Sequence, residues 1–170
     1  MIATIKDALL DVLQADSRLC TGFSGVKRIS SGDQPAFGYV NLFSYPYRLE
    51  KLSSRPAVYI GSTESDLIDT EDIIVASDNM LEYRLLSLPL VIAVSDKDVN
   101  EALKDRDRLL SNLHTVLMDN RVNTYWWLLN VVNVVGRVAP TQGGSVGTNE
   151  VWGRIGCAIR YIRPTNTTLP

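Results

Sequence analysis

The sequence predicts an α+β fold, in which a mostly antiparallel β-sheet carries two α-helices packed on one face. Two segments, one at the N-terminus and one over 98–118, place apolar residues at helical spacing, and the other ordered segments have the patterns of strands. The order of helix, irregular region, strand, insert, long strand, helix and strands favours this layered arrangement. The 170 residues, 45% of them hydrophobic, suffice for one continuous core. We expect a single domain over 1–163, with an acidic insert at 62–80 and a mobile tail at 164–170.

The first element is an amphipathic helix of three to four turns. Its apolar residues recur at helical spacing: Ile2, Ile5, Ala8, Leu9 and Val12. Charged residues interrupt the same segment, so it lacks the apolar run of a secretory signal. We therefore expect the protein to stay in the compartment where it is made.

Glycine and proline punctuate the next region, 21–55, which we expect to be extended and rich in loops, with a possible strand at 37–43. A short strand follows at 56–61 and ends in glycine. The polar insert at 62–80 contains one apolar group, Ile73–Val75, which suggests a hairpin arm or a strand extension.

A strand over 85–95 then passes through a two-residue turn into the second helix. Asp98 is the expected N-cap of this helix, because its carboxylate accepts a hydrogen bond from a free amide of the first turn. Glu101 follows three residues later, so we expect a capping box in which Glu101 reaches back to the Asp98 amide.

The last third of the chain predicts more sheet. Residues 124–138 are rich in valine and aromatic residues, which favour strands, and 151–162 alternate with period two. Between them, 140–150 is expected to be a flexible loop. Its candidate contact residues are Gln142, Gly143, Gly144 and Ser145. They lack the Lys-Ser/Thr ending of a phosphate-binding loop.

No residue pattern indicates catalysis, a cofactor or a metal site. The single histidine, His114, has no neighbouring nucleophile motif, and we expect it on the flank of the second helix, at the boundary between the core and the surface. Cys20 and Cys157 lack metal-ligand spacing and are expected to be buried or half-buried thiols. The uncharged stretch 122–136 contains three asparagines and is too short for a membrane helix.

Charge is distributed unevenly along the chain. Between Arg55 and Arg84 there are seven acidic residues and no Lys or Arg. After residue 120 there are five arginines, and Glu150 is the single acidic residue. This pattern fits either a solvated acidic loop or a head-to-tail ring, in which an acidic surface meets a basic surface of the next subunit. The candidate interface residues are Glu64, Asp66, Asp69, Glu71, Asp72, Arg137, Arg154, Arg160 and Arg163. The acidic spacings do not match an EF-hand calcium loop.

Arg106 falls near the centre of the apolar stripe of the second helix. In one interpretation its methylenes lie along the core while the guanidinium reaches solvent. In the other, Arg106 is a paired arginine at a subunit contact, because a buried guanidinium needs a carboxylate or several carbonyls. Arg106 therefore joins the candidate interface.

Five features follow one another along the chain. They are the N-terminal helix, the Pro-Ala-Val-Tyr-Ile-Gly strand, the acidic insert, the Leu-Pro-Leu-Val-Ile-Ala-Val strand with its capped helix, and a late Ile-Arg-Tyr strand. This order resembles that of the tail terminator (tail completion) proteins of long-tailed bacteriophages, over residues 2–162.

The resemblance implies a subunit of tail-terminator-like fold that forms a ring of about six copies at the head-proximal end of the tail tube. Such a ring terminates tube polymerisation and joins the tail to the head connector. Its implied partners are the tail tube protein and the connector or stopper proteins. DNA passes through its channel without specific binding, which agrees with the net charge of −2. The implied location is the tail or neck of the virion, assembled in the bacterial host cytoplasm, with no cofactor and no membrane.

Other functions stay open at this stage. The chain also fits another neck ring component, such as a head completion or stopper protein. A different class is an aromatic binding module, whose recognition surface would comprise Tyr125, Trp126, Trp127, Tyr45 and Tyr47. A small enzyme ranks third.

Overall fold

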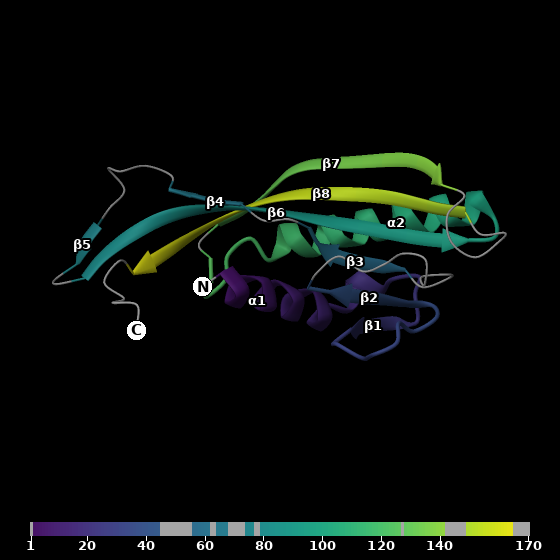
Figure 1. The fold of residues 1–170 in the computed structure, drawn as a ribbon, viewed down its shortest axis with the longest axis horizontal. Coiled ribbons are helices and arrows are strands. Elements are labelled where there is room, and N and C mark those ends of the chain that lie inside the picture. The colour runs from purple at the N-terminus through teal and green to yellow at the C-terminus, as the bar shows by residue number, and fades with distance from the viewer. Residues whose placement is uncertain are drawn as a thin grey trace.

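The computed structural model describes residues 2–44, 56–61, 64–67, 74–76, 79–126, 128–141 and 149–164. These residues form two α-helices, one short 3-10 helix and eight strands (Figure 1). In chain order the elements are α1 (Ile2–Ala15), η1 (Ser17–Cys20), β1 (Gly25–Arg28), β2 (Tyr39–Phe43), β3 (Ala57–Ile60), β4 (Glu64–Leu67), β5 (Ile74–Ala76), β6 (Asn79–Asp96), α2 (Val99–Asp119), β7 (Leu128–Thr141) and β8 (Asn149–Pro164).

All eight strands belong to one sheet, in the order β1-β2-β3-β6-β8-β7, with β4 and β5 paired to β6. The β1–β2 and β2–β3 pairs are parallel, and the other pairings between these strands are antiparallel. Residues of α1, α2 and one face of the sheet share a single hydrophobic core. The predicted α+β class, with a mostly antiparallel sheet and both helices on one face, is therefore confirmed.

The helix α1 has the predicted amphipathic character. Its buried residues are Ile5, Ala8, Leu9, Leu10 and Leu13, while Ile2 and Val12 are partly buried against the core. The buried stripe is thus turned towards Leu10 and Leu13 relative to the stripe expected from the sequence.

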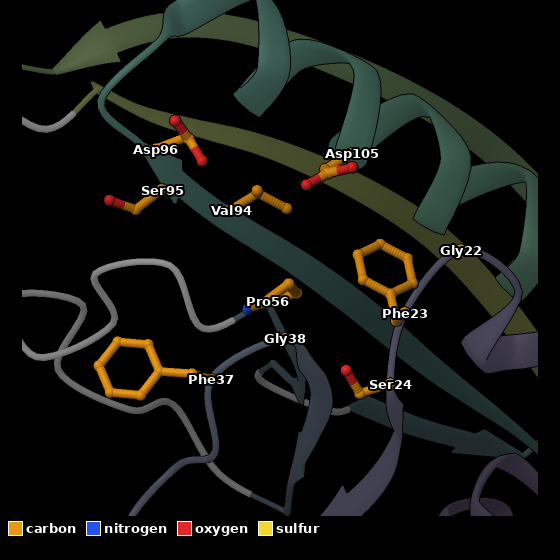
Figure 2. A pocket seen from close by; sticks show the side chains of 10 residues that line it. All are labelled: Gly22, Phe23, Ser24, Phe37, Gly38, Pro56, Val94, Ser95, Asp96 and Asp105. Atoms are coloured by element: carbon orange, nitrogen blue, oxygen red, sulfur yellow. The ribbon is translucent and has the colours of Figure 1, made fainter.

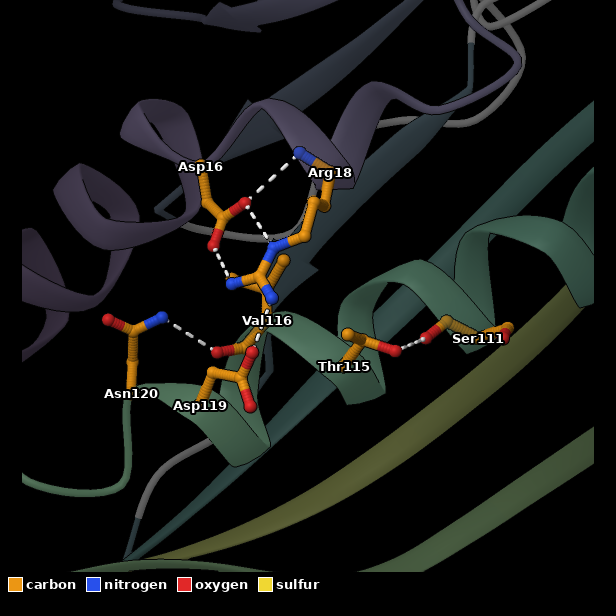
Figure 3. A network of polar contacts seen from close by, with 7 residues as sticks. All are labelled: Asp16, Arg18, Ser111, Thr115, Val116, Asp119 and Asn120. Carbon is orange, nitrogen blue, oxygen red and sulfur yellow. Dashed lines mark hydrogen bonds and ion pairs between the residues drawn. The ribbon is translucent and has the colours of Figure 1, made fainter.

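The short helix η1 ties the end of α1 to the end of α2, and the sequence pattern did not predict it. Asp16 caps η1, because its Oδ1 accepts hydrogen bonds from the Arg18 backbone amide at 3.0 Å and from Arg18 Nε at 2.9 Å. The same guanidinium forms an ion pair with Asp119 in the last turn of α2 (Figure 3). A cation at this position offsets the negative end of the helix dipole.

The start of α2 is confirmed at Asp98, but the capping box is wrong. Asp98 Oδ1 accepts a hydrogen bond from the Asn100 amide at 2.8 Å. The Asp98 amide donates to Asp96 Oδ1 at 2.9 Å, so a preceding turn residue takes the place expected for Glu101. Glu101 instead pairs with Lys104 at 2.6 Å, one turn further along the helix.

β8 shows how the sheet divides into two faces. Its odd-numbered residues from Val151 to Tyr161 are buried towards the helices, whereas the even-numbered residues from Trp152 to Arg160 are half-buried or exposed. On the helix side, Leu110 of α2 lies so close to Gly153 that a Cβ there would be 3.0 Å from Leu110 Cδ1. A second, smaller apolar cluster occupies the other face. Its residues are Ile29, Phe43, Ala57 and Ala93, with Tyr59 and Trp152 packed against them.

β6 and β8 form a long antiparallel ribbon. The 18 residues of β6 span about 60 Å, whereas the 21 residues of α2 span only about 30 Å. The last pairs of the ribbon are Leu81–Pro164, Glu82–Arg163 and Tyr83–Ile162, and β5 pairs with 79–81 of β6. We call residues 79–83 and 162–164 the ribbon tip; it extends past both helices in Figure 1. Of the two predictions for the insert, the hairpin arm is confirmed, because β5 and the start of β6 pair antiparallel from Ile74–Leu81 to Ala76–Asn79.

The predicted loop at 140–150 is wrong at both ends. β7 continues through Pro140 to Thr141, and Thr141 pairs with Glu150 of β8. Proline is tolerated here because β7 is an edge strand and its register shifts between Arg137 and Thr141. The part of the loop between these strands, 142–148, lies outside the described residues.

Candidate functional site

The sheet register places predicted acidic and basic interface residues on neighbouring strands. Asp66 of β4 pairs with Leu85 of β6, and Leu85 pairs with Arg160 of β8, so a single strand separates the two charged positions. At the ribbon tip, Glu82 pairs directly with Arg163. The charge reversal along the sequence therefore becomes, at these positions, a ribbon of mixed charge.

The remaining predicted positions are spread along the sheet. Glu64 pairs with Ser87 on β6, and Arg137 pairs with Trp152 on β8. Arg154 is exposed on the helix-free face, and Arg160 is half-buried on the same face. The Nε atom of Arg160 is buried and has no hydrogen-bond partner among the described residues, which is costly for a charged group. This face therefore carries two arginines of the predicted interface.

Arg106 is buried, at 7% exposure, among the apolar residues of α2. Its Nε and Nη2 both donate to Asp107 Oδ1, at 2.9 and 2.6 Å. The guanidinium thus meets a carboxylate of its own helix, and the Asp107 side chain is 64% exposed. The role of Arg106 at a subunit contact stays a prediction. In such a contact the neighbouring subunit would touch the exposed Asp107 side chain, to which Arg106 is paired.

Several predicted residues lie outside the described part of the chain. They are the acidic Asp69, Glu71 and Asp72, the loop residues Gln142, Gly143, Gly144 and Ser145, and the aromatic residues Tyr45, Tyr47 and Trp127.

Trp126, the central residue of the predicted aromatic recognition surface, is not accessible to a ligand. Trp126 is 2% exposed and its indole Nε1 donates to the Asn120 backbone oxygen at 3.2 Å. It packs in the main core, where it links the end of α2 to the start of β7. Tyr125 is 48% exposed. A buried tryptophan with its polar atom satisfied stabilises the fold and offers no face to a ligand.

His114 is exposed on α2, Cys157 is buried, and Cys20 is half-buried with its Sγ donating to the Ser17 oxygen. Burial raises the pKa of the Cys157 thiol to about 12, so this thiol stays protonated at neutral pH. Among the described residues, no three His, Cys, Asp or Glu side chains come together as metal ligands. No helix in the described ranges has the length and apolar character needed to cross a bilayer.

A pocket of about 390 Å³ lies where the β1–β2 connection approaches the end of β6 and the first turns of α2 (Figure 2). Its lining residues are Gly22, Phe23, Ser24, Phe37, Gly38, Pro56, Val94, Ser95, Asp96 and Asp105. None of these belongs to the predicted interface. A volume of this size is within the range of small-ligand sites.

Two carboxylates and two aromatic rings give the pocket its chemistry. Burial raises the pKa of Asp105, the positive charge of Arg108 lowers it, and the negative charge of Asp96 raises it again. Arg108 contacts Asp105 at 3.0 Å and also lies over the Phe23 ring, 5.9 Å from its centroid. Arg108 therefore holds one wall of the pocket in place. The sequence pattern missed this site because its residues come from five separate segments of the chain.

Glu150 is the second unexpected polar residue. It is 7% exposed, and its Oε1 has no hydrogen-bond partner among the described residues. Burial raises the pKa of the Glu150 carboxyl, and its negative charge contributes to the raised pKa of Tyr59 after burial itself. An unpaired buried carboxylate destabilises the folded state more than a protonated one does.

Glu150→Gln is therefore expected to stabilise the protein more as the pH rises. Because the folded-state pKa is above the unfolded one, the favourable contribution of protonated Glu150 is complete below the unfolded pKa and is lost as the pH rises through the folded pKa. Glutamine keeps the shape and never ionises. Urea unfolding of both proteins between about pH 4 and pH 8 measures the difference. A difference that does not grow with pH contradicts the expectation, and Glu101→Gln, whose side chain is 53% exposed, is the matched control.

Neither a protein-family model nor a curated protein matches the chain.

Proposed function

We propose that the chain is a structural ring subunit of the tail terminator class, located at the head-proximal end of a long-tailed phage tail. In this role it terminates polymerisation of the tail tube and joins the tube to the head connector. The order of elements along the sequence supports the family, and the α+β fold with both helices on one face agrees with it.

The observation that carries the proposal is the ribbon tip. A ring of identical subunits needs two different surfaces on each subunit, one of which contacts the next copy. The main core ends near Leu86 and Tyr161, which are buried, whereas the adjacent Ile162 is 40% exposed. An isolated strand pair is only marginally stable in water. A ribbon that continues past its own helices is therefore suited to pack against a neighbouring subunit.

The mixed charge of the ribbon supports a specific contact with defined register. Glu82 and Arg163 occupy paired positions at the tip, and Asp66 and Arg160 lie two strands apart. Charges of both signs on one contact surface select a single orientation of the partner more than they add affinity.

Ile162→Asp is expected to prevent ring formation while the subunit stays folded. A charge at this exposed position disfavours its burial against a neighbour, but the position is not part of the subunit core. Light scattering coupled to size exclusion, with negative-stain microscopy, should show rings of about six subunits for the parent protein and monomers for the variant. Circular dichroism checks that the variant is folded.

Val122→Asp is the matched control, because Val122 is 75% exposed in the turn after α2 and belongs to neither strand of the ribbon. This variant should assemble like the parent protein. A parent protein that stays monomeric at all concentrations, and does not bind purified tail tubes, would rule out the proposed function. Equal loss of assembly in both variants would remove the ribbon tip from the interface.

A further inference from the structure

The helix-free face of the sheet carries two arginines that lack the ion pairs found elsewhere in the protein. Four arginines outside this face are each paired with an aspartate: Arg18, Arg28, Arg106 and Arg108. Arg154, which is exposed, and Arg160, which is half-buried, form no ion pair with a described residue. The Nε atom of Arg160 is buried and unpartnered in the described part of the chain. Buried polar atoms of native proteins usually have a hydrogen-bond partner.

The sheet register leaves both arginines without an acidic neighbour on the adjoining strands. Arg154 pairs with Val91 of β6 and with Val135 of β7, and the cross-strand partners of Arg160 are leucines on both sides. An opposite charge at a cross-strand position would stabilise the sheet. The directly paired strands therefore supply no carboxylate to either guanidinium group.

Aromatic residues lie beside Arg154 on the same face. Trp152 precedes it by two residues on β8, and Tyr59 of β3 pairs with Val91, its neighbour on β6. Both rings are half-buried and pack against the smaller apolar cluster. Arg, Trp and Tyr are the residue types most enriched among the residues that carry binding energy at protein interfaces. We call Tyr59, Val91, Trp152, Arg154 and Arg160 the arginine face; its composition is that of a protein-binding surface.

The hairpin arm carries the complementary charge. Residues 56–83 contain seven acidic residues and no Lys or Arg, and Glu64, Asp66 and Glu82 of this set lie on β4 and β6. We call β4, β5 and residues 79–83 the acidic arm; β5 and the start of β6 extend past both helices in Figure 1. Opposite charges on two surfaces favour their contact and fix its orientation.

We propose that the arginine face receives the acidic arm of the neighbouring copy in the ring. This inference rests on the proposed function, and it identifies the surface of the next subunit that the ribbon tip and the arm reach. The carboxylates of the arm pair with Arg154 and Arg160, while Tyr59 and Trp152 pack beside them and exclude water. Because the arm and the face are different surfaces, each subunit contacts one neighbour with its arm and the other with its face.

The test uses two charge-reversed full-length variants and their mixture. The face variant is Arg154→Glu, and the arm variant is Glu64→Lys with Asp66→Lys. Each variant alone should weaken self-association about tenfold, because like charges then meet at every contact. An equimolar mixture should restore rings, since each subunit then meets a neighbour of opposite charge at both surfaces. Light scattering coupled to size exclusion, with negative-stain microscopy, measures assembly, and circular dichroism checks folding.

Two matched variants separate the contact from a general effect of charge. Arg154→Lys keeps the positive charge of the face and should assemble like the parent protein. Arg121→Glu reverses an exposed arginine between α2 and β7, outside the arginine face, and should also assemble like the parent protein.

The outcomes distinguish this contact from the proposed function. If Arg154→Glu forms rings as stable as those of the parent protein, the inference is wrong and the proposed function stands. The same holds if both variants are folded and monomeric and their mixture stays monomeric. A parent protein that never self-associates overturns the ring and this contact together. Rings of Arg154→Glu that no longer bind purified tail tubes would overturn the inference in favour of a contact with the tube protein.

Discussion

Trp126→Ala is expected to lower the free energy of unfolding by about 3–5 kcal/mol. Trp126 is 2% exposed and is among the largest fully buried side chains of the described chain. Its removal leaves a cavity between the end of α2 and the start of β7. It also leaves the Asn120 backbone oxygen without the indole donor at 3.2 Å. The loss should appear in urea unfolding followed by circular dichroism, as a lower midpoint at an unchanged slope.

Two variants show which part of the side chain matters. Trp126→Phe keeps most of the buried area and loses the indole donor, so it should cost only about 1–2 kcal/mol from the donor. Tyr125→Ala changes the adjacent aromatic residue, which is 48% exposed, and should cost clearly less than Trp126→Ala. If Tyr125→Ala were as damaging as Trp126→Ala, the structural role assigned to Trp126 would be wrong. A change in Trp126 fluorescence on addition of a ligand would instead support the hypothesis that the protein is an aromatic binding module.

Gly153→Val is expected to destabilise the protein by about 1–3 kcal/mol, because the new side chain overpacks the contact between β8 and α2. A Cβ at this position would lie 3.0, 3.1 and 3.2 Å from Leu110 Cδ1, Cδ2 and Cγ. The two γ-methyl groups of valine require α2 to move or Leu110 to leave its rotamer. The measurement is again the urea midpoint.

A double mutant identifies the cause. Leu110→Ala should be less destabilising in the Gly153→Val background than in the parent protein, because the space it vacates accommodates the valine. Ala158→Val, on the opposite face of the same strand, is the matched control and should have a much smaller effect. Additive effects of Gly153→Val and Leu110→Ala would mean that the two side chains do not compete for space.

Local patterns in the sequence predicted the elements whose signal is contained in one segment. The alternation of β8, the amphipathic stripe of α1 and the Asp98 cap each depend on residues a few positions apart, and all three are present in the structure. The capping box failed because Asp96 competes for the same amide that Glu101 was expected to reach. Two acceptors near one donor cannot be ranked from spacing alone.

Features assembled from distant segments were not predictable in this way. β1 has only four residues, and its parallel pairing with β2 depends on tertiary context. The charge pattern was visible in the sequence, but the pairing of Glu82 with Arg163 depends on β6 and β8 being neighbours. The pocket combines residues from Gly22 to Asp105, so no local motif marks it. Of the predicted interface, Arg106 is the residue whose burial followed most directly from its place on the helical stripe.

The central position of β8 has a consequence for how the chain folds during synthesis. β8 follows β6 and β7 along the chain, yet it lies between them in the sheet, and Pro164 at its end pairs with Leu81. Until β8 is made, one long edge of β6 lacks this partner strand, and both the main core and the sheet are incomplete. Such long-range pairing folds slowly and exposes strand edges to other nascent chains. The sheet and the main core can therefore be completed only after β8 has been translated.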